Sequence, residues 1–220
     1  MLKRRQVLLA AGASISSLPF PAFAQTAGSS LKGTPIENTK LTHLTDQRDA
    51  PVVFYTPKVD PQAVLEIFKA VGLPVQGKVG LKVVFGNNRD RAKMIDPDLL
   101  KPIADELRAT LIESNYMDSA RSDATTHLST AKELGYDRVA PIDILDADRE
   151  IVIPVRNGYH LKEFITGSHL ANYDTLVSIV RFKGHNLQRY GGSMKNLSIC
   201  LGTARGACQI HSAGEVTDYY

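Results

Sequence analysis

Residues 79–112 read VGLKVVFGNNRDRAKMIDPDLLKPIADELRATLI and contain the clearest structural pattern of the chain. The run 79–85 is apolar and rich in β-branched residues, which predicts a buried strand. Asp96-Pro97 then supplies a capping residue and a proline at the first helical position, the usual start of a helix. The apolar residues that follow share one helical face: Leu100, Ile103, Ala104 and Leu107. A second apolar run begins at Thr110, so the stretch predicts strand, helix and strand.

The same devices recur on both sides of this stretch. Upstream, 52–55 predicts a strand, and Asp60-Pro61 opens a helix with the apolar face Val64, Ile67, Phe68 and Val71. Downstream, Asp123 caps a helix with the face Ala124, His127, Leu128 and Ala131, which Gly135 ends. Further apolar runs predict strands at 142–145, 151–155 and 175–181.

This alternation predicts an α/β fold, a three-layer structure with a mostly parallel sheet and helices on both faces. Ligands of such sheets bind beyond the carboxyl ends of the strands. Three polar loops follow predicted strands, at 86–91, 115–121 and 183–185. Strand-end loops are polar in any case, but their concentration of Arg, Lys and His favours a shared site.

The first 24 residues resemble an export signal of the twin-arginine type. Arg4-Arg5 precedes a mildly apolar stretch, and Ala22-Phe23-Ala24 fits a cleavage site before Gln25. An ordinary secretory signal with a chance arginine pair is the alternative. We therefore expect a periplasmic or otherwise exported protein. Residues 25–49 are polar and without periodicity, typical of a linker or extended arm, and the α/β domain is expected over 50–220.

Composition bounds the possible partners. The chain has 220 residues, 43% of them hydrophobic, which suits one globular domain with a tail. No run of apolar residues is long enough to span a membrane after signal cleavage. The formal charge of +3 equals the contribution of Lys3, Arg4 and Arg5, so residues 25–220 are formally neutral. A broad surface for nucleic acid is therefore not expected.

The two cysteines, Cys200 and Cys208, leave three alternatives open. An oxidising periplasm permits a disulfide between them, buried free thiols suit them equally, and metal ligation is the third possibility. The chain has no Cys-x-x-Cys pair. It therefore has no complete ligand set for an iron–sulfur cluster.

Residues 175–214 form a basic segment that contains no Asp or Glu. Its positive and titratable side chains are Arg181, Lys183, His185, Arg189, Lys195, Arg205 and His211. Its glycines, Gly184, Gly191, Gly192, Gly202 and Gly206, would let backbone amides approach a phosphate or carboxylate. The segment is thus either a local anion site or a glycine-rich loop with solvated cations.

The order of motifs in this segment resembles the bacterial and archaeal family known as domain of unknown function 362. The resemblance rests on Phe182-Lys183-Gly184-His185, on 190–197, on 200–206 and on Ile210-His211-Ser212, and extends upstream to about residue 50. Some members continue into a ferredoxin-like module with two four-cysteine clusters. The resemblance thus implies an association with iron–sulfur centres and a redox partner protein. It also implies that this chain is a short member or a fragment.

A more distant similarity links His185, Lys195 and His211 to nickel-pincer lactate racemases, which have the same residue types in the same order and spacing. That similarity implies an acid–base His185, a bond from Lys195 to an organic cofactor, and nickel on His211. The second acid–base histidine of those enzymes falls at Ala120-Arg121 here. His127 lies further on, on an apolar helix face, and is expected to pack in the core. Racemase activity is therefore not expected.

These observations define one candidate site. His185 is the expected catalytic residue and His211 the expected metal ligand. The expected cofactor-binding residues are Lys195, Lys183, Asn88, Arg89, Arg121, Gly191, Gly192 and Asn196.

The function expected from this site is binding of an anionic cofactor or of a metal, nickel or another transition metal with an organic cofactor, for redox or acid–base chemistry. The alternative is a non-catalytic module that binds a small anion or a partner's iron–sulfur centre. The third possibility is a glycine-rich turn that only closes the fold. The sequence leaves open whether the protein is an enzyme.

Overall fold

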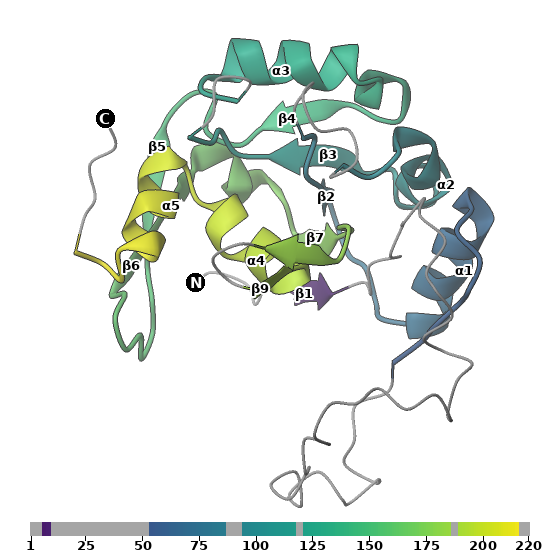
Figure 1. Ribbon diagram of the computed structural model, residues 1–220, viewed down its shortest axis with the longest axis horizontal. Helices are drawn as coiled ribbons and strands as arrows, with labels where there is room; N and C mark the ends of the chain where they lie inside the picture. The colour runs from purple at the N-terminus through teal and green to yellow at the C-terminus, as the bar shows by residue number, and fades with distance from the viewer. Residues whose placement is uncertain (1–5, 10–52, 87–93, 118–120, 186–188, 216–220) are drawn as a thin grey trace, which may run out of the picture.

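The centre of the molecule is a parallel sheet (Figure 1). The structure, a computed structural model, describes residues 53–86, 94–117, 121–185 and 189–215, together with the backbone of 6–9. The strand order is β1-β7-β2-β3-β4, and every neighbouring pair is parallel. The strands are β1 (Gln6–Leu9), β2 (Val79–Lys82), β3 (Thr110–Glu113), β4 (Ile142–Ile144) and β7 (Thr175–Ser178).

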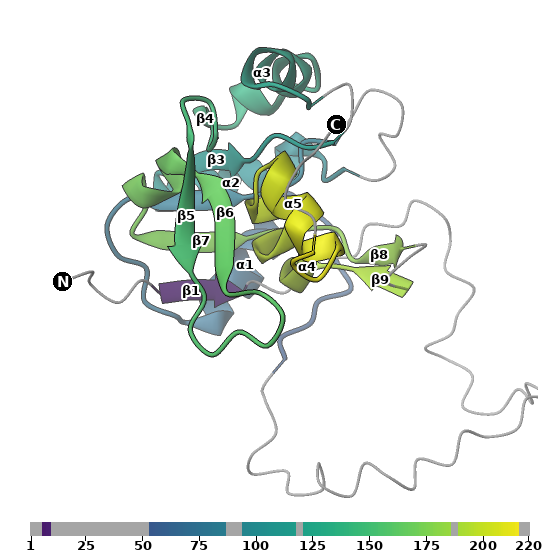
Figure 2. The same ribbon diagram turned by 90° about the vertical axis from the view of Figure 1, so that its left-hand side faces the viewer.

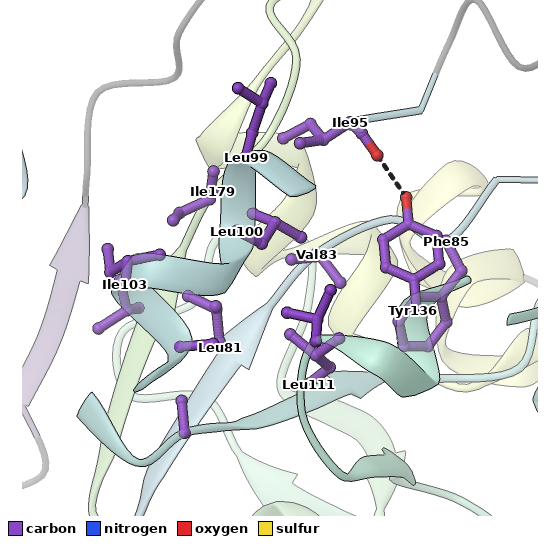
Figure 3. Packing of buried hydrophobic residues seen from close by; sticks show 14 of the residues in the cluster. Leu81, Val83, Phe85, Ile95, Leu99, Leu100, Ile103, Leu111, Tyr136 and Ile179 are labelled. Carbon is purple, nitrogen blue, oxygen red and sulfur yellow. Dashed lines mark hydrogen bonds between the residues drawn. The ribbon is translucent and has the colours of Figure 1, made fainter. Parts of the chain in front are cut away.

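Three helices cover one face of this sheet: α1 (Pro61–Val71), α2 (Pro97–Leu107) and α3 (Ala124–Glu133). Asp60, Asp96 and Asp123 cap them as the sequence predicts, each accepting a hydrogen bond from a backbone N–H of the first turn. Their apolar faces pack on β2 and β3 in one cluster (Figure 3). Its fully buried members include Leu81, Val83, Phe85, Leu100, Ile103, Leu111 and Tyr136.

The opposite face carries a β-hairpin and short helices. The hairpin consists of β5 (Glu150–Pro154) and β6 (Glu163–Gly167), which pair in antiparallel fashion (Figure 2). Beside it lie the 3₁₀ turns η4 (Ser168–Asn172) and η5 (Ile199–Leu201) and the helix α4 (Ser193–Leu197). A second apolar cluster fills this side: Ile112, Leu145, Leu170, Tyr173 and Leu201. The predicted α/β fold with a parallel sheet between helical layers is confirmed.

The structure corrects several predicted elements. Residues 53–55 form no strand, and Val53 and Tyr55 are exposed, because no neighbouring strand covers their side chains. The strand predicted at 175–181 ends at Ser178. The sequence pattern does not predict β6 or the small hairpin of β8 (Lys183–His185) and β9 (Arg189–Gly191). Residues 1–5 and 10–52 lie outside the described residues, and residues 6–9 of the predicted signal form the edge strand β1. The signal and the linker remain predictions, and cleavage after Ala24 would remove β1 from the sheet.

The last helix, α5 (Ala204–His211), is fixed against the hairpin. A Cβ on Gly206 would lie 2.0 Å from the carbonyl oxygen of Ile165 in β6, so only glycine allows this approach. The Arg205 guanidinium lies 2.7 Å from the Glu150 carboxylate of β5, and Thr203 donates a hydrogen bond to the same carboxylate. Gly206 therefore serves the packing of α5 against β6.

A half-buried ion cluster connects η4 to β4. The two ring nitrogens of His169 lie 2.7 Å from carboxylate oxygens of Asp143 and Asp148. Tyr173 donates a 2.6 Å hydrogen bond to the other oxygen of Asp143. The hydrogen bonds to Asp143 and then to Asp148 raise the pKa of His169 above its usual value, since they stabilise the imidazolium. The cluster therefore favours the protonated form of His169 between two carboxylates.

None of the helices in the described ranges is long and apolar enough to cross a membrane.

Candidate functional site

A pocket opens where β2, β3 and β7 end, the edge at which parallel sheets bind ligands. Its cavity volume is about 150 Å³. The residues that line it follow these strands or belong to β8, β9, α4 and η5: Val84, Ile95, Tyr116, Arg121, Val180, Arg181, Lys183, His185, Gly191, Gly192, Lys195, Asn196 and Cys200. Seven of the sequence-predicted site residues are thus brought to one cavity.

His185 and Lys195 form the closest pair of titratable groups in this pocket. His185 ends β8, and Lys195 lies on α4, which follows the β8–β9 hairpin directly. The Lys195 Nζ lies 2.5 Å from the His185 Nε2. A hydrogen bond at this distance requires one lone pair, so the ammonium of Lys195 donates to a neutral imidazole.

The surroundings of His185 favour this neutral form. Loss of solvation lowers the pKa of His185, and the charges of Lys195, Lys183 and His211 lower it further. Each of these effects penalises the imidazolium, because it would be less hydrated and placed among cations. A bound anion would oppose the effect of the neighbouring cations on the pKa of His185. Protonation of His185 and anion binding are therefore expected to favour each other.

The remaining basic side chains complete a positive lining. Lys183 and His185 lie on β8, Arg181 precedes it, and Arg121 follows β3. The Arg121 guanidinium stacks over the Tyr116 ring, 5.0 Å from its centroid, and its Nη1 lies 3.4 Å from the Glu113 carboxylate. Gly191 and Gly192 bring backbone to the cavity wall. Within the part of the chain that the structure describes, no Asp or Glu side chain lines this pocket.

Asn196 attaches α4 to the middle of the sheet. Its side-chain amide donates hydrogen bonds to the Lys82 carbonyl of β2 (3.0 Å) and to the Ser178 hydroxyl of β7 (2.9 Å). Its Oδ1 accepts a 2.9 Å hydrogen bond from the Lys82 ammonium. Both ends of the amide are therefore used inside the protein, and Asn196 fixes the helix that carries Lys195.

Lys82 belongs to a buried network of charges beneath the pocket. Its side chain is fully buried, and its Nζ lies 4.0 Å from the Glu113 carboxylate and 2.9 Å from the Val83 carbonyl oxygen. Burial lowers the pKa of Lys82, although the charge of Glu113 opposes this. Burial alone would raise the pKa of Glu113, but Lys82, His127 and Arg121 together lower it to about 2. Glu113 is thus an anion held among three basic groups.

His127 is packed as the sequence predicts, and it also joins this network. Its ring is fully buried and lies edge-on to Phe85, with ring centroids 5.6 Å apart. Its Nε2 lies 3.2 Å from the Glu113 carboxylate, and its Nδ1 lies 3.3 Å from the Asn115 Oδ1. Glu113 also accepts a 2.8 Å hydrogen bond from the Phe85 N–H. The network therefore connects the carboxyl ends of β2 and β3 with α3.

Three of the predicted site residues are not placed in the pocket. His211 ends α5, is exposed and does not line the cavity, although its charge acts on His185. Asn88 and Arg89 lie outside the described residues, so their expected role remains a prediction. Cys200, which lines the pocket, and Cys208 in α5 are free thiols in this structure.

The described residues do not fit a metal centre made by this chain. The resemblance to nickel enzymes implied a metal on His211, near a cofactor bonded to Lys195. Across the described ranges, no group of three or more His, Cys, Asp and Glu side chains is arranged to hold a metal ion. Among the described pocket-lining residues, His185 offers an imidazole nitrogen and Cys200 a sulfur as a possible metal ligand. We therefore derive no step through a metal.

Sequence reasoning missed Lys82 and Glu113, and it missed the apolar lining residues Val84, Ile95 and Val180. One signal for Lys82 is visible in retrospect: it is a single charge inside the continuous apolar run 79–85. A buried lysine needs a buried acid, and Glu113 stands at the end of the adjacent predicted strand. Val84 and Val180 fall in the predicted strands 79–85 and 175–181, Ile95 falls in no predicted element, and nothing in the sequence marks the three as pocket walls.

Fold and site together define an α/β protein with a positively charged pocket at the carboxyl edge of a parallel sheet. Residues 79–218 match a family model described as a domain of unknown function (DUF362), and the chain belongs to this family. No curated protein and no solved structure is significantly similar to the chain. The family description names no activity, so the residues of the pocket are the basis of the functional proposal.

Proposed function

We propose that this protein binds a small organic anion in the pocket. The observation that carries the proposal is the charge of the lining: Arg121, Arg181, Lys183, His185 and Lys195 contribute to it, and none of the described lining residues carries a carboxylate. Cations gathered around a cavity raise the local concentration of an anion and lose part of their mutual repulsion when it binds. Gly191 and Gly192 add closely approaching backbone, which is common where anions are held.

The test is anion binding by a lysine variant and a matched control. We expect Lys195→Met to weaken binding of benzoate at least tenfold, as measured by isothermal titration calorimetry, because a charge-assisted hydrogen bond is lost. Lys101→Met removes an exposed lysine whose partner is Asp105 on α2, and it should leave the affinity unchanged. Equal affinities of all three proteins would contradict the proposal.

The pH dependence of the same binding has a definite sign. The pKa of His185 is lowered in the free protein, and an anion in the pocket should raise it by stabilising the imidazolium. The affinity for benzoate should therefore increase as the pH falls through the interval in which His185 becomes protonated. His185→Gln should remove this increase. Titration of the His185 ring by NMR, with and without benzoate, measures the direction of the pKa change.

A second candidate function is acid–base catalysis on the bound anion. The neutral imidazole of His185 at 2.5 Å from the Lys195 ammonium favours it, since such a pair can accept a proton from a ligand and return it. Exchange of deuterium from solvent into carbon positions of bound carboxylic acids would distinguish catalysis from binding. We would expect His185→Gln to abolish such exchange while Lys101→Met preserves it.

We further propose that the chain is exported to the periplasm by the twin-arginine route. The proposal is supported by Arg4-Arg5 and by the Ala22-Phe23-Ala24 cleavage pattern. Replacing both arginines by lysine should keep the protein in the cytoplasm of a bacterial host, and the intact mass of the exported wild type should correspond to a chain that begins at Gln25. Unchanged export of the double variant would contradict the twin-arginine route but not cleavage of the leader.

A further inference from the structure

The pocket has an apolar part that a purely electrostatic anion site would not need. Val84, Ile95 and Val180 line it together with the basic residues. Ile95 and Val180 are each only 5% exposed. They come from three separate segments, after β2, before α2 and after β7, so several elements of the fold combine to place apolar surface beside the cations.

The size of the cavity limits what this apolar part can hold. A cavity volume of about 150 Å³ is comparable to that of an engineered apolar cavity that accepts one benzene molecule, roughly 150 Å³. A ring or a branched chain of about six carbons therefore fits. A nucleotide or another large anion would extend out of the cavity, and an ion such as phosphate would leave Val84, Ile95 and Val180 in contact with water.

The apolar part of the lining limits where an acidic group of the ligand can lie. A carboxylate can be paired by the basic side chains of the pocket and by the backbone of Gly191 and Gly192. A carboxylate that lay against Val84, Ile95 or Val180 would be an unpaired charge, which is costly.

Given the proposed function, we infer that the ligand class is a monocarboxylic acid with a compact apolar body of about the size of benzoate. The inference rests on the same pocket as the proposed function, but it depends on Val84, Ile95 and Val180 and not on the cations. Burial of the body should contribute most of the affinity, since removing apolar surface from water is favourable.

Isothermal titration calorimetry with four ligands of graded chemistry tests this class. We expect benzoate to bind at least tenfold more tightly than acetate, which lacks the body, and at least tenfold more tightly than terephthalate, which carries a second carboxylate on the far end. Inorganic phosphate should bind no better than acetate. Benzoate no tighter than acetate, or terephthalate or phosphate tighter than benzoate, would overturn the inference.

A pair of conservative variants tests the apolar wall itself. Val180→Thr keeps the shape of the side chain and replaces one methyl group by a hydroxyl, so it should weaken benzoate binding about three- to tenfold and acetate binding by clearly less. Val152→Thr is the matched control, because Val152 is 57% exposed on β5 and does not line the pocket. An unchanged benzoate affinity in Val180→Thr would overturn the inference.

The two proposals fail in different ways. If acetate, phosphate and benzoate bind with similar affinity and Lys195→Met weakens all three, the anion site stands and the apolar specificity is wrong. If none of the four ligands binds the wild type, the proposed function is wrong as well.

Discussion

Replacing Lys82 by methionine should lower the free energy of unfolding by about 3–5 kcal/mol, the usual cost of removing one member of a buried ion pair. The variant leaves the Glu113 carboxylate without its nearest ammonium and the Asn196 Oδ1 without its donor. Both groups are buried, so water does not replace the lost partner. Urea unfolding followed by circular dichroism gives the value.

Two comparisons make this result specific to the network. Lys69→Met removes an exposed lysine that lies 3.2 Å from Glu106, and it should cost less than about 1 kcal/mol. The double variant Lys82→Met/Glu113→Gln should cost clearly less than the sum of its single variants, because removing the second charge relieves the first defect. Additive costs, or a Lys82→Met variant as stable as Lys69→Met, would show that the two groups do not interact.

Replacing Gly206 by alanine should destabilise the protein by about 3 kcal/mol, at the upper end of the usual cost of overpacking. The new Cβ would lie 2.0 Å from the Ile165 carbonyl oxygen, which is backbone in β6 and has no rotamer by which to withdraw. Helix α5 would have to move away from the hairpin, and the contacts of Thr203 and Arg205 with Glu150 would be strained. Thermal unfolding and hydrogen exchange of α5 measure the effect.

Gly184→Ala is the matched control for this substitution. Gly184 lies in the same basic segment, but a Cβ built there meets no atom within 4 Å. We expect a change of less than about 0.5 kcal/mol, as for surface substitutions in general. A large loss of stability in Gly184→Ala together with a small one in Gly206→Ala would contradict the assigned roles of these glycines.

The sequence was sufficient for the elements whose pattern is local. The Asp-Pro and Asp caps predict the starts of α1, α2 and α3 because capping depends on neighbouring residues alone. The strand predicted at 52–55 is wrong at its described residues, because an apolar run becomes a strand only if another strand pairs with it. The hairpin β5–β6 also depends on tertiary packing, since its residues alternate poorly and its inner face is completed by η5 and α5.

Part of the site could be predicted from residue types and from the position of loops at the sheet edge. His185, Lys183 and Arg121 were found because their residue types are unusual for strand-end loops, and the parallel-sheet rule brings such loops to one edge. Lys195 was found from the basic segment and from the resemblance to known families. The roles of the glycines could not be told apart, because a Cβ on Gly206 would meet backbone and a Cβ on Gly184 would meet nothing within 4 Å, which no spacing reveals. Lys82 and Glu113 escaped notice because a buried charge is recognisable only once its partners across the sheet are known.

The hydrogen bond between Lys82 and Asn196 also has a consequence for the order of folding steps during synthesis. These residues are 114 positions apart in the chain, and β7, the strand beside β2, is separated from it by α2, α3 and the hairpin. Contacts so distant in sequence form late, because a long loop must close before they contribute. The ribosome must therefore release Asn196 before the charge on Lys82 can be enclosed, and nascent chains shorter than this should remain open to proteolysis and dependent on chaperones.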